Sequence, residues 1–153
     1  MELMALLNNL FALIATTSLT IQFIVLFLLV YGYLLKRRLK FRQHGITMAV
    51  AVVLHLAMVF VIMIPSFVFA VFPEYIVRSP LELTSIIGLV HEVAGALAIS
   101  LGVWLVASWR FRRDFKGCFN KKKIMLGTMI IWVAALLFGI ALYTIFYWAI
   151  LIS

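Results

Sequence analysis

Acidic side chains are scarce in this chain of 153 residues, which has five Asp and Glu against thirteen Lys and Arg. Only 12% of its residues are charged and 67% are hydrophobic, whereas soluble domains average about 25% charged and about 45–50% apolar residues. A small domain leaves a large share of its surface exposed. It cannot hide this much apolar surface in a core of its own, so lipid is the expected solvent for most of the chain.

Residues that build common catalytic sites are also rare. The single cysteine, Cys118, excludes an internal disulfide. A di-iron carboxylate site is excluded because the apolar stretches offer no second inward carboxylate beside Glu92. Neither a hydrolytic triad nor a phosphate-binding loop has candidate residues. We therefore expect an electron carrier or an accessory subunit and not a stand-alone enzyme.

The chain does contain four long apolar stretches, each with the roughly 20 residues that a membrane helix needs. They cover approximately residues 11–35, 45–72, 80–109 and 124–152. Because the connections between them are short, consecutive helices should be antiparallel neighbours. The sequence predicts a single domain, an all-α integral membrane protein folded as an up-down four-helix bundle.

Positive charge is confined almost entirely to two of the connections. Twelve of the thirteen basic residues lie there: Lys36, Arg37, Arg38, Lys40, Arg42, Arg110, Arg112, Arg113, Lys116, Lys121, Lys122 and Lys123. The positive-inside rule places both basic loops in the cytoplasm and both termini outside, in a multi-pass protein of the cell membrane. Anionic lipid headgroups explain the clusters, so nucleic acid is not an expected partner.

Prolines and a capping pattern indicate how the second span ends and the third begins. Pro65 lies inside the second span and should kink it, and Pro73 should stop that helix soon afterwards. Ser79 followed by Pro80 and Glu82 is typical of a helix N-terminus. The sequence thus predicts a loop from residue 73 to residue 79.

All three histidines lie in or at the edge of predicted spans. His44 and His55 are eleven residues apart on the second helix, so they share a face and are separated by about 16 Å along its axis. His44 lies at the inner boundary and His55 near the middle of the membrane. On the third helix, His91 shares a face with Gly88 and Gly95. Such a glycine stripe is common in close helix packing, but small residues beside an inward histidine also admit a flat macrocycle.

Haem in a helix bundle needs an axial imidazole. We therefore expect a haem b bound between the second and third helices, with His91 and His55 as axial ligands. Pairing of His91 with Met58 or Met63, or a single ligand, stays open as an alternative. His44 is either a further metal ligand or a boundary residue that meets lipid headgroups.

Glu92 follows His91 and points about 100° away from it. A charged Glu is costly in lipid, so we expect it to be neutral or paired. It is a candidate proton carrier, or a hydrogen-bond partner of Gln22.

Several short motifs carry a resemblance that extends over residues 36–143. They are His44-Gly-Ile-Thr-Met48 at the start of the second helix, His91 early in the third, and Trp132, Gly139 and Tyr143 in the last. With these motifs the chain resembles a family of small four-helix membrane proteins that includes an assembly factor for haem-A-containing terminal oxidases. It departs from the family pattern at Asn120, where a histidine is usual, and in the additional His55.

The resemblance implies haem-related biology in a respiratory membrane. The leading hypothesis is a b-type cytochrome-like protein that transfers electrons or serves as a subunit of a respiratory membrane complex. The first alternative is a non-redox assembly factor for a haem-copper oxidase, which holds haem or copper transiently. The second is a structural membrane subunit whose histidines only form interhelical hydrogen bonds. Expected partners are membrane lipid, respiratory subunits and a quinone, and a homo-oligomer remains open.

Overall fold

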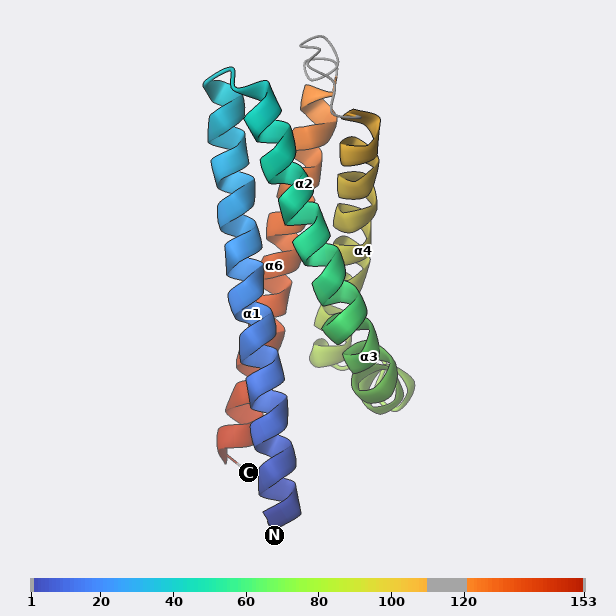
Figure 1. Ribbon diagram of the computed structural model, residues 1–153. Helices are drawn as coiled ribbons and strands as arrows, with labels where there is room; N and C mark the ends of the chain where they lie inside the picture. The colour runs from blue at the N-terminus through green and yellow to red at the C-terminus, as the bar shows by residue number, and fades with distance from the viewer. Residues whose placement is uncertain (1, 110–120, 153) are drawn as a thin grey trace.

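Four long helices dominate the computed structural model, which describes residues 2–109 and 121–152 (Figure 1). They are α1 (Glu2–Arg37), α2 (Phe41–Met58), α4 (Leu83–Trp109) and α6 (Lys122–Ile152), and the described residues form no β-strand. Four helical stretches are long and apolar enough to cross a membrane, the second of them running on from α2. The predicted all-α four-helix membrane fold is confirmed.

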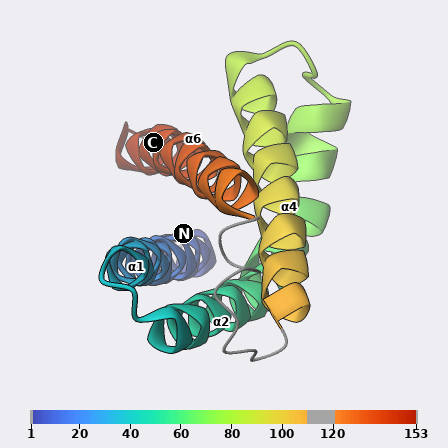
Figure 2. The same cartoon turned by 90° about the horizontal axis from the view of Figure 1, so that it is seen from above.

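The helices pack as two antiparallel hairpins. The largest contacts are those of α1 with α2 and of α4 with α6, while α2 with α4 and α1 with α6 close the ring. Seen along the bundle, the four helices surround a common centre (Figure 2). Both termini lie at the end opposite the α1–α2 turn (Figure 1). The buried core is small, and its residues are Val25, Leu29, Ala51, Val52, Ala98 and Trp132.

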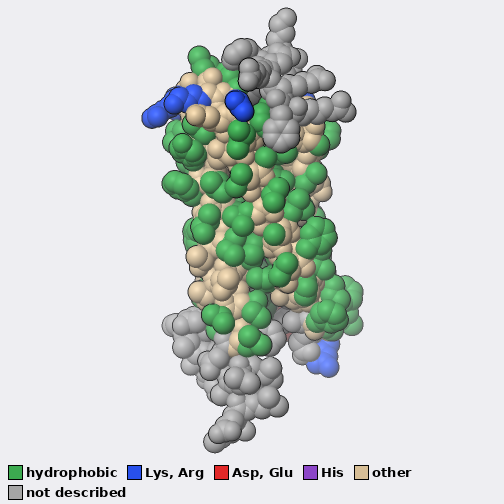
Figure 3. Space-filling model, in the orientation of Figure 1, with side chains coloured by type: hydrophobic (Ala, Val, Ile, Leu, Met, Phe, Trp, Pro, Cys, Tyr) green, Lys and Arg blue, Asp and Glu red, His purple; other side chains and the backbone are tan. Residues whose placement is uncertain are grey.

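Apolar side chains also cover the outside of the bundle. On the face shown in Figure 3, hydrophobic groups extend over the whole middle of the molecule, and the Lys and Arg side chains lie near its two ends. Examples on the outside are Phe27, Val61 and Leu97, each more than half exposed. This distribution is the one expected of helices whose outer surface faces hydrocarbon.

A tight turn joins α1 to α2 within the first basic cluster. The amide of Leu39 donates to the carbonyl of Lys36 at 3.1 Å, and that of Lys40 donates to Leu35 at 3.0 Å. This pair of bonds closes a helix C-terminus in the Schellman arrangement, which needs one residue in the left-handed conformation. Leu39 fills that position with φ 58°, where glycine is the usual residue. The second helix therefore begins at Phe41, four residues earlier than the sequence predicts.

The second span does not remain α-helical. Two π-helical segments, η1 (Val59–Met63) and η2 (Phe67–Val77), flank the short α3 (Ile64–Ser66). The ribbon turns at α3, where the sequence predicts a kink at Pro65 (Figure 1). Pro73 lies inside η2 and does not end it. In an α-helix the proline ring clashes with the carbonyl four residues earlier, and here Pro65 lies between the two π-helical segments and Pro73 inside the second.

The connection to α4 is correspondingly later and shorter than expected. Residues 78–82 form the turn, and α4 begins at Leu83 instead of Pro80. Ser79 still organises this helix start, but through its carbonyl oxygen. That oxygen accepts bonds from the Glu82 amide at 3.1 Å and from the Ser85 hydroxyl at 2.7 Å.

Candidate cofactor-binding site

Each of the three histidines uses its Nδ1 atom to bond a neighbouring helix. The three bonds are His44 to the Gly32 carbonyl at 2.7 Å, His55 to the Gln22 side-chain oxygen at 3.0 Å, and His91 to the Ala135 carbonyl at 2.8 Å. An amide oxygen only accepts, so Nδ1 carries the hydrogen and Nε2 carries the lone pair. Metal-binding histidines are oriented in this way, by a hydrogen bond from the nitrogen that does not touch the metal.

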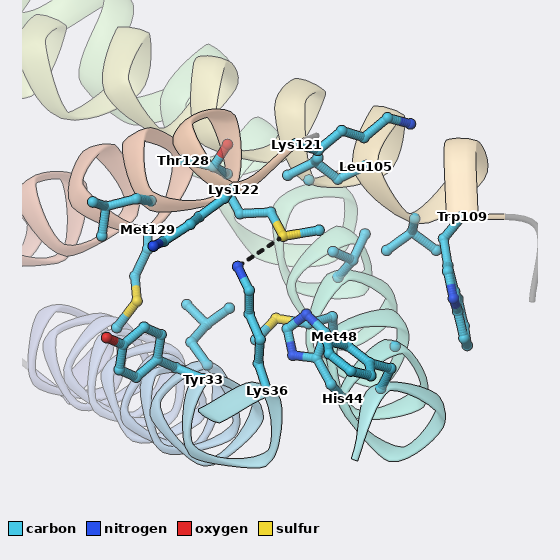
Figure 4. A pocket seen from close by; sticks show the side chains of 18 of the residues that line it. Tyr33, Lys36, His44, Met48, Leu105, Trp109, Lys121, Lys122, Thr128 and Met129 are labelled. Carbon is cyan, nitrogen blue, oxygen red and sulfur yellow. Dashed lines mark hydrogen bonds between the residues drawn. The ribbon is translucent and has the colours of Figure 1, made fainter. Parts of the chain in front are cut away.

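His44 lines a cavity of about 530 Å³ at the basic end of the bundle. All four long helices contribute to its walls (Figure 4). The apolar part of the lining includes Leu29, Leu39, Phe41, Val52, Leu105, Val106, Leu126, Trp109 and Trp132, together with Met48, Met125 and Met129. His44 is itself 8% exposed, so its ring lies inside the protein and not among headgroups.

Glycines allow the helices to approach each other around this cavity. A Cβ atom at Gly45 would collide with the indole of Trp109, and one at Gly32 would collide with the side chain of Met48. Gly32 also exposes the carbonyl that holds His44. Glycine at position 32 therefore permits the close approach of α1 and α2, and glycine at position 45 permits that of α2 and the end of α4.

Positive charge surrounds the mouth of the cavity. Lys36, Arg37, Lys121 and Lys122 all line it, and none of its described lining residues is acidic. Lys36 points into the space between the helices and donates to the sulfur of Met125 at 3.5 Å (Figure 4). The cavity thus combines apolar walls, an oriented imidazole and a cationic rim. A flat apolar molecule with anionic groups at one edge matches these properties.

His55 has a different environment, deeper in the bundle. Its ring is 4% exposed and lies edge-on to Trp132, with 4.9 Å between ring centroids and 62° between ring planes. Its Nε2 atom has no hydrogen-bond partner among the described residues. Gln22, which the sequence offered as a partner of Glu92, is bonded to His55 instead.

His91 is half-buried and lies against α6. A Cβ atom at Gly139 would be 2.8 Å from Cε1 of the His91 ring, so this glycine makes room for the histidine itself. The predicted glycine stripe on α4 is not uniform. Gly88 is buried, whereas a Cβ at Gly95 would meet no atom within 4 Å. The close helix approach expected at Gly95 is thus not found among the described residues.

The structure places His55 and His91 against the same stretch of α6, near enough for their charges to interact, but not on the cavity. His55 packs against Trp132 and His91 against Gly139, while neither histidine lines the cavity. Met58 is buried, also outside the cavity lining. Within residues 2–109 and 121–152, no three His, Cys, Asp or Glu side chains gather as a metal-ligand group. Of the predicted ligands, His44 is the one that lines this cavity.

Comparison with protein-family models, curated proteins and solved structures found no match. The family resemblance therefore stays a prediction. The structure nevertheless shows what its α6 motif does in this chain: Trp132 packs on His55, Gly139 accommodates His91, and the Tyr143 hydroxyl lies 3.1 Å from that of Thr16. Asn120 lies outside the described residues.

Proposed function

We propose that this chain is a haem-binding membrane protein of the b-type cytochrome kind, with haem b bound in the cavity at the basic end. The observation that carries the proposal is the position of His44. Its imidazole lines a cavity of about 530 Å³, and its Nδ1 atom is fixed by the Gly32 carbonyl at 2.7 Å. The lone pair of Nε2 is then the one that would hold the haem iron.

The rest of the lining fits the two ends of such a ligand. Apolar and aromatic walls match the macrocycle, and the ammonium groups of Lys36 and Lys122 match its carboxylates through charge-assisted hydrogen bonds. Met129 of α6 lines the cavity as well and offers a thioether as a second ligand. Bound haem supplies one-electron chemistry, and the chain supplies binding, orientation and exclusion of water.

The location follows from the same charge distribution. We place the protein in the cell membrane with the basic end in the cytoplasm and both termini outside, because the basic α1–α2 turn and the basic start of α6 lie at the same end of the bundle. The sequence resemblance supports a respiratory membrane, with electron transfer or a subunit role in a larger complex. Other respiratory subunits, a quinone and lipid are the proposed partners.

The test is an absorption spectrum of the protein purified in detergent after expression with ample haem. The wild type should show reduced b-type bands, and His44→Ala should lose them because the axial bond is lost. His55→Ala and His91→Ala are the matched controls, since neither ring lines the cavity. Loss of the bands in those two variants, with retention in His44→Ala, would instead support the pair of ligands predicted from the sequence.

One observation favours a second candidate, a structural subunit without cofactor. All three histidines already form interhelical hydrogen bonds, which are common stabilising contacts in membrane bundles. A colourless wild type that elutes as a single folded species would support this reading and contradict the cytochrome proposal. Haem or copper that is present at substoichiometric amounts and lost during purification would favour the assembly-factor alternative.

A further inference from the structure

Three polar side chains from three helices meet in the middle of the bundle. Gln22 comes from α1, His55 from α2 and Trp132 from α6. The Nδ1 atom of His55 bonds the Gln22 oxygen at 3.0 Å, and the rings of His55 and Trp132 are 4.9 Å apart. All three are more than nine-tenths buried, with 8%, 4% and 5% of their surface exposed.

Each of these side chains has one polar atom without a hydrogen-bond partner among the described residues. The atoms are Gln22 Nε2, His55 Nε2 and Trp132 Nε1, and they are the three buried side-chain atoms of this kind found there. Buried polar groups nearly always form hydrogen bonds. A polar group that is removed from water and finds no partner in the protein costs free energy. Three such atoms in one contact cluster therefore indicate a shared partner.

The hydrogen-bonding roles of the three atoms identify that partner. Gln22 Nε2 and Trp132 Nε1 are donors, and His55 Nε2 is an acceptor because its hydrogen is on Nδ1. A cation would be repelled by the two donors. A water molecule accepts two hydrogen bonds and donates two, and a buried water typically makes about three.

The surroundings of the three side chains are apolar and buried. Val25, Ala51 and Val52 belong to the same core cluster as Trp132 and are themselves 0–5% exposed. We propose that Gln22, His55 and Trp132 form a binding site for one buried water molecule, which joins α1, α2 and α6 at the centre of the membrane. The water site is separate from the proposed haem site. Of the three residues that form it, Trp132 alone also lines the cavity.

The test is an NMR measurement on isotope-labelled protein in detergent micelles, in which the indole N–H signal of Trp132 is assigned by its loss in Trp132→Phe. In the wild type this N–H should show direct cross-relaxation with water and a shift typical of a hydrogen-bonded indole. Gln22→Met removes one of the three partners and should reduce that cross-peak at least severalfold.

Thr128→Val is the matched control. It removes a buried hydroxyl of α6, one turn from Trp132, and the Thr128 hydroxyl donates to the Ile124 carbonyl at 2.9 Å. It should leave the water cross-peak unchanged. A Trp132 N–H that shows no contact with water, or a cross-peak that survives Gln22→Met unchanged, would overturn the three-residue site. Contact with lipid or detergent chains in place of water would overturn it too.

Discussion

At the scale of single residues, the three histidines show how one type of hydrogen bond leads to different environments. Each donates from Nδ1 to an oxygen of a neighbouring helix. What remains for Nε2 depends on the residues opposite: a cavity for His44, and an indole edge for His55. Sequence periodicity placed His44 and His55 on one face of the second helix but left a headgroup position open for His44, whereas both rings are buried. It could not predict the bonds to the carbonyls of Gly32 and Ala135. Every residue has a backbone carbonyl, so the sequence does not show which one accepts a side-chain bond.

Two glycines on facing helices provide a residue-scale prediction. Gly139→Ala should destabilise the bundle by about 1–3 kcal/mol, because the added methyl meets the His91 ring at 2.8 Å and that ring is held by its bond to Ala135. Gly95→Ala is the matched control, since open space surrounds that position. It should be neutral, or stabilising by up to about 1 kcal/mol through helix propensity.

The free energy of unfolding of both variants can be measured by denaturant titration in mixed micelles. Equal destabilisation by the two changes would contradict the packing of His91 on Gly139. The same comparison distinguishes Gly95, which belongs to the glycine stripe, from Gly139, which belongs to the α6 motif. In the sequence alone both are simply small residues of a membrane helix. Only the position of the neighbouring helix distinguishes them.

At the scale of the elements, hydropathy predicted four helices and their order but not the form of the second span. The sequence indicates a disturbance at Pro65 and a stop at Pro73. The structure instead continues to Val77 through π-helical turns. Local rules assume α-helical hydrogen bonding, in which an interior proline is a breaker. They fail where the chain changes to a wider helix, because that choice depends on packing along its whole length.

Contact between α2 and α4 is the element-scale feature that joins the two hairpins. A Cβ atom at Gly102 would be 3.2 Å from a methyl group of Val52. In a variant without Cys118, the pair Val52→Cys and Gly102→Cys should therefore form a disulfide under mild oxidation. The combination Val53→Cys and Gly102→Cys is the control, because Val53 is 64% exposed and faces outward. Shifts in gel mobility report the link, and equal cross-linking of both pairs would contradict this helix arrangement.

At the scale of the whole molecule, composition alone was enough to predict a membrane bundle. Two-thirds of the residues are hydrophobic, and the face shown in Figure 3 is indeed apolar over its middle. The cavity could not be predicted in the same way. Its residues come from four helices and include Lys36 and Lys122, which in the sequence belong only to charge clusters. Their inward position depends on how the helix ends converge.

Orientation in the membrane is tested by two exposed positions at opposite ends, again without Cys118. Leu81 in the α4-side turn is 89% exposed and Leu39 in the basic turn is 66% exposed. An impermeant thiol reagent applied to intact cells should label Leu81→Cys and leave Leu39→Cys unlabelled until the membrane is permeabilised. The reverse pattern would place the basic end outside and contradict the proposed topology.

The distribution of histidine bonds within the two hairpins has a consequence for how the protein is made. His44 and His55 join α2 to α1, and His91 joins α4 to α6. Every histidine bond is therefore complete within its own half of the chain. The first hairpin can leave the translocation machinery with its two histidine bonds already formed while the second is still being synthesised. Biogenesis then requires only that two finished halves meet in the bilayer, with Trp132 of the later half closing over His55 of the earlier one.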